Sequence, residues 1–276
     1  MHDTTFELPK DVFDPEGFLR ALKSSSSRIP LFKKNIERST DYLHQQFQKG
    51  HYIRELVWAR ARFFDDVLSS AWQLFDWQDD SISLIAVGGY GRKELHPHSD
   101  IDLLILLGKN NHEQQQENIS AFITLLWDMN LDIGHSVRTI DECRTEAAKD
   151  ITIATNLMES RTIIGPVELL DNLLNEVGPD KIWPSSEFFR AKWDEQIERH
   201  RKHGNSEYNL EPNVKSSPGG LRDVQMIAWI AKRHFDTQSI EELVERDIQF
   251  NYYQGRGGSA RGLSTRTGIL RVSLHT

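Results

Sequence analysis

The stretch Ile82–Leu107 reads ISLIAVGGYGRKELHPHSDIDLLILL. Its first apolar run ends at Gly88 and Gly89, and a second apolar run begins with the acidic pair Asp100 and Asp102. Short apolar runs bounded by turn residues are typical of buried β-strands. The stretch therefore predicts two strands, with a glycine turn at the end of the first and two carboxylates at the start of the second.

The glycines and the acidic pair each have a chemical use. Gly88 and Gly89 lack the Cβ atoms that would keep a phosphate away from backbone N–H groups. Asp100 and Asp102 are two residues apart on one strand, so their side chains share a face with Cα atoms roughly 6.5 Å apart. This separation lets them share two cations about 3.5–4 Å apart. Mg²⁺ prefers carboxylate and phosphate oxygens, so the stretch predicts a phosphoryl-transfer site with two magnesium ions.

The loop between the two strands carries further polar groups. Arg92 and Lys93 directly follow the glycines, where they would neutralise the β- and γ-phosphates of a nucleotide. Ser99 precedes the acidic pair and would donate a hydrogen bond to the same phosphates. The alternative is that all three side chains are simply solvated, as basic residues in turns usually are.

A second distinctive stretch is Tyr208–Gln225, YNLEPNVKSSPGGLRDVQ. It contains a sharp Pro-Gly-Gly turn followed by a helix start. Lys215, Arg222 and Asp223 form a concentrated polar group here, as a second wall of a nucleotide cleft would need. The alternative for Asp223 is plain helix capping.

Composition narrows the class of protein. The formal net charge of the 276 residues is −8, which argues against a surface that coats nucleic acid. The lone cysteine, Cys143, cannot form an internal disulfide and indicates a reducing compartment. The N-terminus has no apolar signal core, and no run approaches the roughly 18 apolar residues of a membrane span. We therefore expect a cytoplasmic protein that binds neither nucleic acid nor membrane.

Periodicity along the chain predicts an α+β protein in four parts. The parts are a flexible N-terminal arm at 1–29 with one short helix near residues 15–23, a domain of helices and a sheet at 30–145, a helical region at 146–246 and a disordered or non-native tail at 247–276. Within 30–145, amphipathic helices at 30–77 are expected to pack on a sheet at 82–138. Within the tail, the glycine- and arginine-rich segment 254–268 is expected to be disordered because it has too few apolar residues to bury.

The order strand, Gly-Gly, short loop, Asp-x-Asp, strand resembles the nucleotidyltransferase superfamily related to DNA polymerase β. The resemblance implies that 30–145 is a nucleotidyltransferase domain with a mixed sheet flanked by helices, followed here by the helical region. It also implies a third carboxylate on a neighbouring strand that faces the acidic pair. Asp132 heads the alternating segment 131–138 and is the candidate for this role, completing the second metal's shell and helping to deprotonate the attacking hydroxyl. The alternative is a strand-edge carboxylate beside a turn.

Together, five motifs resemble a narrower family, the bacterial PII uridylyltransferase/uridylyl-removing enzymes. They are GGYGRKELHPHSDIDLLILL at 88–107, LDIGHSVRT at 131–139, IATNLMESRTIIG at 153–165, YNLEPNVKSSPGGLRDVQ at 208–225 and RHF at 233–235. The resemblance covers about residues 10–246. It implies magnesium-dependent transfer of UMP from UTP to a tyrosine hydroxyl of the PII signalling protein, with release of pyrophosphate. It places Gly88, Gly89, Asp100 and Asp102 in the uridylyltransferase site.

The chain also departs from that family. Family members are longer and continue into a metal-dependent HD phosphohydrolase domain, which removes UMP, and into two glutamine-sensing ACT domains. The present sequence contains neither, so we expect addition of UMP only, from a truncated product. Two alternatives remain open: a nucleotidyltransferase of different specificity, and an inactive fragment that only binds nucleotide or PII. A third, an RNA-binding arm in the Gly/Arg tail, is disfavoured by the net charge.

Overall fold

The computed structural model describes residues 6–77, 81–108, 112–202, 213–235, 248–253 and 269–274, with no side-chain description at 112–114, 248–253 and 269–274. The chain divides into two compact units, Met1–Ile182 and Trp183–Thr276. The first unit begins with three helices, α1 (Pro15–Ser24), α2 (Arg28–Gln48) and α3 (Ile53–Trp72). Its remaining elements are β1 (Ile82–Ala86), α4 (Gly88–Gly91), β2 (Ile101–Leu107), α5 (His112–Asp128), β3 (Ile133–Thr139), α6 (Ile140–Lys149), α7 (Ile151–Met158), β4 (Arg161–Ile164) and α8 (Val167–Glu176).

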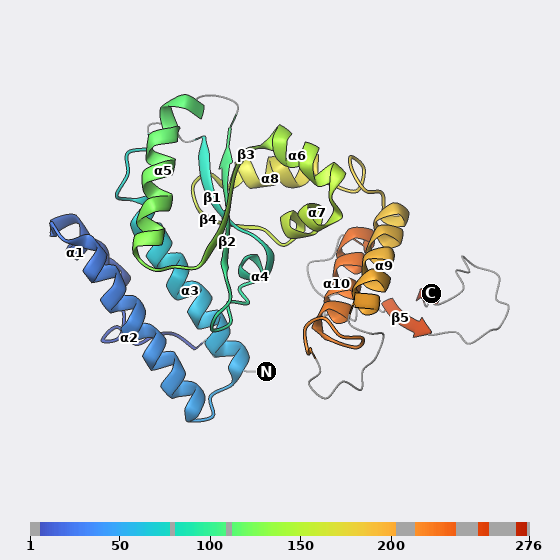
Figure 1. Cartoon of the computed structure of the whole chain (residues 1–276), viewed down its shortest axis with the longest axis horizontal. Helices are drawn as coiled ribbons and strands as arrows, with labels where there is room; N and C mark the ends of the chain where they lie inside the picture. Colours follow the sequence, from blue (N-terminus) through green and yellow to red (C-terminus); the bar gives the residue numbers. More distant parts are fainter. Residues whose placement is uncertain are drawn as a thin grey trace. The chain divides into compact units, whose positions relative to one another are not determined.

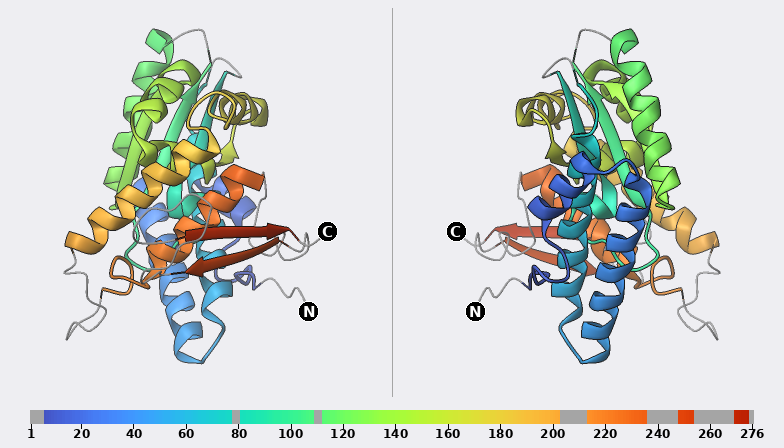
Figure 2. Two further views of the ribbon diagram at one scale, coloured as in Figure 1. Left: turned by 90° about the vertical axis from the view of Figure 1, so that its right-hand side faces the viewer. Right: turned by 90° about the vertical axis from the view of Figure 1, so that its left-hand side faces the viewer.

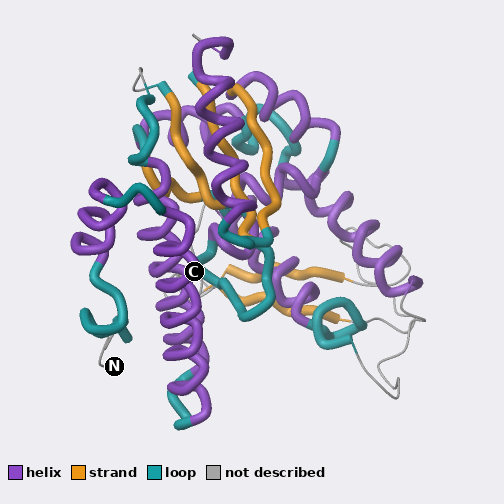
Figure 3. Tube along the Cα trace, turned by 60° about the vertical axis from the view of Figure 1, so that its left-hand side comes forward, coloured by secondary structure: helices purple, strands orange, loops and turns teal. Residues whose placement is uncertain are grey.

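The four strands of the first unit form one mixed sheet in the order β3-β2-β1-β4. β1 is antiparallel to both β2 and β4, whereas β2 and β3 run parallel. In Figure 1, α5 lies on one side of the strands and α6 and α8 lie on the other, and Figure 3 shows the strands between these helices. The predicted mixed sheet flanked by helices is confirmed.

The two faces of the sheet have different roles. Alternate residues of β1 and β2, including Leu84, Leu103 and Ile105, are buried in the main hydrophobic core together with Phe64 of α3 and Phe122 of α5. Since side chains alternate along a strand, Asp102 and Leu104 point to the opposite face. The face with α3 and α5 therefore holds the core, and the other face carries the acidic residue.

Of the arm predicted at 1–29 the structure describes residues 6–29, and α1 corresponds to the short helix expected near residues 15–23. Asp14 caps α1 by accepting a hydrogen bond from the Gly17 N–H at 3.1 Å, and Pro15 opens the helix. Phe18 and Leu22 of α1 are buried in the main core. These two buried side chains fix the capped helix on the core, a contact that the polar composition of the segment does not indicate.

The long helices α2 and α3 form an antiparallel hairpin, seen in blue in Figure 2. The turn contains Gly50, whose φ of +84° lies in the left-handed region that glycine adopts without strain. This arrangement agrees with the expected helices within 30–77.

The first unit extends beyond the predicted domain boundary at residue 145. It continues to Ile182 because β4 pairs with β1 at the edge of the sheet and α8 contacts β1. The four-residue strand was too short to mark a domain by periodicity. The predicted helical region, 146–246, therefore begins inside the sheet-containing unit.

The second unit contains α9 (Ser185–Lys202), α10 (Leu221–Phe235), β5 (Ile248–Tyr253) and β6 (Ile269–Leu274). β5 and β6 pair as an antiparallel hairpin inside the tail that was expected at 247–276 to be disordered or non-native. Both are rich in the β-branched and aromatic residues that favour strands. Residues 254–268, which prompted that expectation, lie outside the described residues.

Candidate active site

Three strand ends meet at one edge of the sheet. Because β1 and β2 are antiparallel, the end of β1 lies beside the start of β2, and the Val87 N–H donates to the Asp102 carbonyl at 3.1 Å. Because β2 and β3 are parallel, their starts are neighbours, and the Ile101 N–H donates to the Asp132 carbonyl at 2.9 Å. The fold thus brings the glycine turn, the acidic pair and Asp132 to one place.

The Asp102 carboxylate lies between two glycines from different strand ends. A Cβ atom on Gly134, the β3 partner of Asp102 in the sheet, would lie 2.5 Å from Asp102 Oδ1. A Cβ atom on Gly88 would lie 3.4 Å from Asp102 Oδ2. Glycine at position 134 therefore makes room for this carboxylate, which was not recognised from the sequence, whereas a Cβ at position 88 would make an ordinary contact with it.

Asp100 and Asp132 are exposed and immediately precede β2 and β3. The alternation of side chains along extended backbone places Asp132 on the same face as Gly134, and hence as Asp102. In the part of the chain that the structure describes, no three acidic, histidine or cysteine side chains already converge as a metal-binding group. The oxygen donors nevertheless suit Mg²⁺, which takes one or two carboxylates and completes its shell with phosphates and water. The role of Asp132 as a third carboxylate stays a prediction.

The glycine turn forms the single helical turn α4. Gly88 has a φ of +58°, which favours glycine, and the Gly91 N–H donates to the Val87 carbonyl at 3.0 Å. Around Gly89 there is space, because an added Cβ would come no closer than 3.5 Å to the Glu94 carbonyl oxygen. Gly91 is different, since an added Cβ would lie 2.0 Å from the Glu159 carbonyl oxygen. Gly89 is open to a ligand, whereas Gly91 has a packing role.

The three loop residues predicted to contact phosphate lie in different settings. Arg92 is half-buried and forms ion pairs with Glu94 at 2.8 Å and with the buried Glu159 at 2.5 Å. Burial opposes its charge, but these two carboxylates raise the Arg92 pKa above its ordinary value. Lys93 and Ser99 are both exposed. Arg92 therefore ties the loop to the end of α7, and Lys93 is the cation left facing solvent.

A cluster of polar side chains packs against the glycine turn. The Tyr90 hydroxyl donates to the Asp65 carboxylate at 2.6 Å, and Arg161 of β4 pairs with the same carboxylate at 2.8 Å. The Arg161 guanidinium also lies 5.0 Å from the centre of the Tyr90 ring. Burial, followed by the charge of Asp65, raises the pKa of Tyr90 well above its ordinary value. The cluster joins α3, α4 and β4, and sequence spacing gave no sign of it.

Asp66, next to Asp65, makes stability depend on pH. Burial and the neighbouring Asp65 raise the Asp66 pKa from 3.8 to about 6. The folded protein then binds more protons than the unfolded chain between about pH 4 and 6, so this contribution to stability is present at low pH and is lost as the pH rises through 6. Asp66→Asn should therefore stabilise the protein more at pH 7.5 than at pH 4.5. Urea denaturation at both pH values measures this; Asp41→Asn, on the exposed side of α2, is the control, and an equal effect at both pH values would contradict the assignment.

The residues predicted as a second wall belong to the second unit. Asp223, in the first turn of α10, accepts hydrogen bonds from the Gly219 N–H at 2.8 Å and from Arg199 at 2.5 Å. Burial would raise the Asp223 pKa, but hydrogen bonds from the Gly219 N–H and His200 outweigh burial and lower it. Asp223 thus fastens the turn to α9. Arg222 bonds to Gln225, Lys215 is exposed, and the predicted contact of all three with nucleotide stays a prediction.

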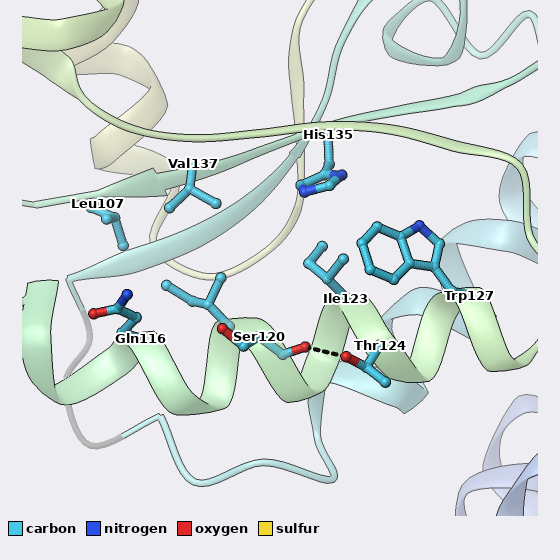
Figure 4. Close-up of a pocket in the computed structure, with 9 residues that line it drawn as sticks. Leu107, Gln116, Ser120, Ile123, Thr124, Trp127, His135 and Val137 are labelled. Carbon is cyan, nitrogen blue, oxygen red and sulfur yellow. Dashed lines mark hydrogen bonds between the residues drawn. The ribbon is translucent and has the colours of Figure 1, made fainter.

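Two cavities border β3 on opposite faces of the sheet. One of about 530 Å³ lies between α5 and β3 and is lined mainly by apolar groups, with the ring centres of Trp127 and His135 5.8 Å apart (Figure 4). It contains none of the predicted catalytic residues. The other, of about 240 Å³, is lined by Asp102, Gly134 and residues of α7. Although smaller, the second cavity is the one next to the carboxylates.

Comparison with known proteins agrees with this geometry. Residues 68–157 match the family described as nucleotidyltransferase domain, and residues 187–250 match the family described as GlnD PII-uridylyltransferase. The bifunctional uridylyltransferase/uridylyl-removing enzyme of Pseudomonas syringae pv. syringae (strain B728a) is 50% identical to this chain, over 86% of this chain and 26% of the enzyme. The enzyme of the same name from Azotobacter vinelandii (strain DJ) is 51% identical, over 86% of this chain and 27% of the enzyme.

The chain thus spans about a quarter of the length of these curated relatives. Across the described residues, no helix has the length and apolar character needed to cross a membrane. The shared sequence includes the stretch that builds the glycine turn and the acidic strand start. Over most of its length the chain is therefore similar to part of the bifunctional uridylyltransferase/uridylyl-removing enzymes, and residues 68–157 match a nucleotidyltransferase domain.

Proposed function

We propose that this chain transfers UMP from UTP to a tyrosine hydroxyl of a PII protein and releases pyrophosphate. The observation that carries the proposal is the Asp102 carboxylate, held between Gly88 and Gly134 where three strand ends meet. The relatives, named for uridylyl transfer, are about 50% identical over 86% of this chain, which supports UTP as the donor. The proposal concerns addition of UMP only.

The triphosphate is assigned to the glycine turn. The space over Gly89 lets a phosphate approach the backbone N–H groups at the start of α4. Lys93 is exposed beside this turn, and its amine has no ion-pair partner among the described residues. Lys93 is therefore the better candidate for phosphate contact than Arg92, whose charge is already balanced by two carboxylates. Ser99, exposed just before the acidic pair, is the nearest hydroxyl donor.

The metal is assigned to the carboxylates. Asp100 and Asp102, with Asp132 as the third, would hold two magnesium ions, and bound magnesium would stabilise the negative charge that develops on the α-phosphate and on the departing pyrophosphate. The acceptor oxygen forms a bond to the α-phosphorus while the bond from that phosphorus to the bridging oxygen of the β-phosphate breaks. The proton of the acceptor hydroxyl passes to Asp132, which is exposed to solvent and can release it.

A transfer assay tests this function directly. The 276-residue chain is mixed with PII, magnesium and each of the four labelled nucleoside triphosphates, and label on PII is measured. We expect labelling from UTP above the other three, and loss of labelling when the acceptor tyrosine of PII is changed to phenylalanine. Preference for ATP would show a nucleotidyltransferase of other specificity. Absence of labelling, with a UTP-dependent rise in melting temperature, would show that the chain binds nucleotide without transferring it.

A single methyl group tests the phosphate assignment. Gly89→Ala should change the melting temperature little, because the new Cβ meets no atom closer than 3.5 Å. If a phosphate lies against this backbone, the same methyl group should weaken UTP binding about tenfold or more, since it blocks the close approach. Isothermal titration with UTP measures the effect. Unchanged affinity in a folded variant would remove the triphosphate from the glycine turn.

A further inference from the structure

The cavity beside Asp102 runs along the sheet away from the carboxylates. Its polar lining comes from Ser136 and Arg138 of β3, on the same face as Gly134, and from Asn156 of α7. Arg138 is the fourth residue after Gly134, which lies opposite Asp102, and this corresponds to about 13 Å of strand. The cavity therefore begins at the reacting end of the candidate site and ends at a guanidinium.

The polar groups of this cavity are available to a ligand. Arg138 is half-buried, and within the described residues its guanidinium makes no hydrogen bond or ion pair, although it interacts through its charge with Glu146 of α6. The Asn156 amide and the Ser136 hydroxyl have no hydrogen-bond partner there either. Ser136 is also half-buried, whereas Asn156 is exposed. The cavity thus presents three polar side chains that are free to pair with a ligand.

The rest of the lining is apolar. Leu104 of β2 forms the floor, and Ile153 and Leu157 of α7 form one side. The volume is about 240 Å³, so the cavity is too small for a whole nucleoside triphosphate but suits a nucleoside. Apolar walls with a few polar groups at the ends are typical of small-molecule sites.

The positions of the polar groups indicate the direction in which a nucleotide would lie in the cavity. Asn156 Oδ1 lies 3.7 Å, and Asp102 Oδ2 3.4 Å, from the point where a Cβ on Gly88 would stand. Asn156 is therefore near the phosphate end, whereas Arg138 is at the far end. A nucleotide with its α-phosphate at Asp102 would place its sugar near Asn156 and the far edge of its base near Arg138.

We propose that this cavity binds the nucleoside of the substrate, with Asn156 at the ribose and Arg138 donating to a carbonyl at the far edge of the base. This inference rests on the proposed nucleotidyl transfer. Arginine has only donors, so it pairs with the O4 carbonyl of uracil and opposes the N4 amino group of cytosine. Ile153 and Leu157 pack against the ring, and Arg138 determines the preference for UTP over CTP.

Filling the cavity tests where the nucleoside binds. Ile153→Trp should weaken UTP binding to the 276-residue chain about tenfold or more, because the indole occupies the space of the base. Inorganic tripolyphosphate lacks a nucleoside, so its affinity should change less than about twofold. Val137→Trp is the matched control: it lies next to Arg138 on the other face of β3 and lines the opposite cavity, so it should leave both affinities unchanged. Unchanged UTP affinity in folded Ile153→Trp, or equal weakening of both ligands, would overturn the proposal.

A second variant tests the base contact without filling the cavity. Arg138→Gln introduces an acceptor beside a donor, so the ratio of UTP to CTP affinity should fall about 10- to 100-fold. Arg144→Gln, at an exposed position on α6, should leave the ratio unchanged. An unchanged ratio in Arg138→Gln would remove this residue from the base. If transfer to PII falls while UTP affinity does not, the cavity holds the acceptor, and the nucleoside assignment is wrong.

Failure of this inference is separable from failure of the proposed function. If the wild-type chain prefers a nucleotide other than UTP, the uridylyl assignment fails. The change in affinity that Ile153→Trp causes for that nucleotide, compared with its change for tripolyphosphate, still decides whether a nucleoside occupies the cavity. Conversely, labelling of PII from UTP with unchanged UTP affinity in Ile153→Trp would keep the function and reject the cavity.

Discussion

Asp102→Asn should lower the rate of nucleotidyl transfer by about 100- to 1000-fold, because it removes one negative charge where the reaction needs cations to be held. The amide has nearly the same shape as the carboxylate and fits the space left by Gly134. The fold should therefore survive, and the melting temperature should change little. Initial rates measured over a range of Mg²⁺ concentrations should show both the lower rate and a weaker magnesium dependence.

The control for this experiment is an aspartate that lies outside the candidate site. Asp171 is exposed on α8, so Asp171→Asn should keep wild-type rates. Asp132→Asn, made in parallel, tests the third carboxylate: a rate loss near that of Asp102→Asn supports it, and wild-type activity removes it. Wild-type transfer by Asp102→Asn with normal magnesium dependence would refute the metal-ligand assignment of Asp102.

The centre of this site was predictable from sequence because it is local. Gly88, Gly89, Asp100 and Asp102 lie within fifteen consecutive residues, and strand alternation alone places both carboxylates on one face. The position of β3 beside β2 was expected from the resemblance to a known superfamily. What periodicity could not supply was the register, in which Asp102 faces Gly134 and needs a glycine there.

The contacts that hold the glycine turn were not predictable, because they join residues far apart in the chain. Arg92 follows the glycines and was expected at the phosphates, but Glu159 binds it from the end of α7. Asp65 joins Tyr90 to Arg161 across three elements. A sequence does not show which charged residues form ion pairs. A basic side chain whose charge is balanced by a buried carboxylate is less available to bind phosphate.

The three glycines of the turn also differ in ways that only the contacts between distant residues reveal. All three belong to one motif, GGYG, yet Gly88 is needed for its backbone angle, Gly89 has open space, and Gly91 touches another element. Only the position of Glu159, at the end of α7, sets Gly91 apart. A family motif therefore marks these residues together without showing which of them would bind and which would pack.

Gly91→Ala should be the most destabilising single change in the turn, by about 2–3 kcal/mol. The new Cβ would lie 2.0 Å from the Glu159 carbonyl oxygen and 3.1 Å from the Ala86 carbonyl oxygen, and both are backbone atoms that cannot rotate away. Relief requires α4 to move from β1 or the end of α7 to shift. For a unit of this size the loss corresponds to roughly 5–10 °C in melting temperature.

Gly89→Ala is the matched control for Gly91→Ala, because it adds the same methyl group two residues earlier in the same turn. It should melt close to wild type, whereas Gly91→Ala should melt lower with or without nucleotide. Because α7 also carries Asn156, which lies beside Gly88, a shift of α7 should weaken UTP binding as well. A Gly91→Ala protein that melts within about one degree of wild type would show that the turn and α7 are not in contact in solution, and the tie between Arg92 and Glu159 would then lose its support.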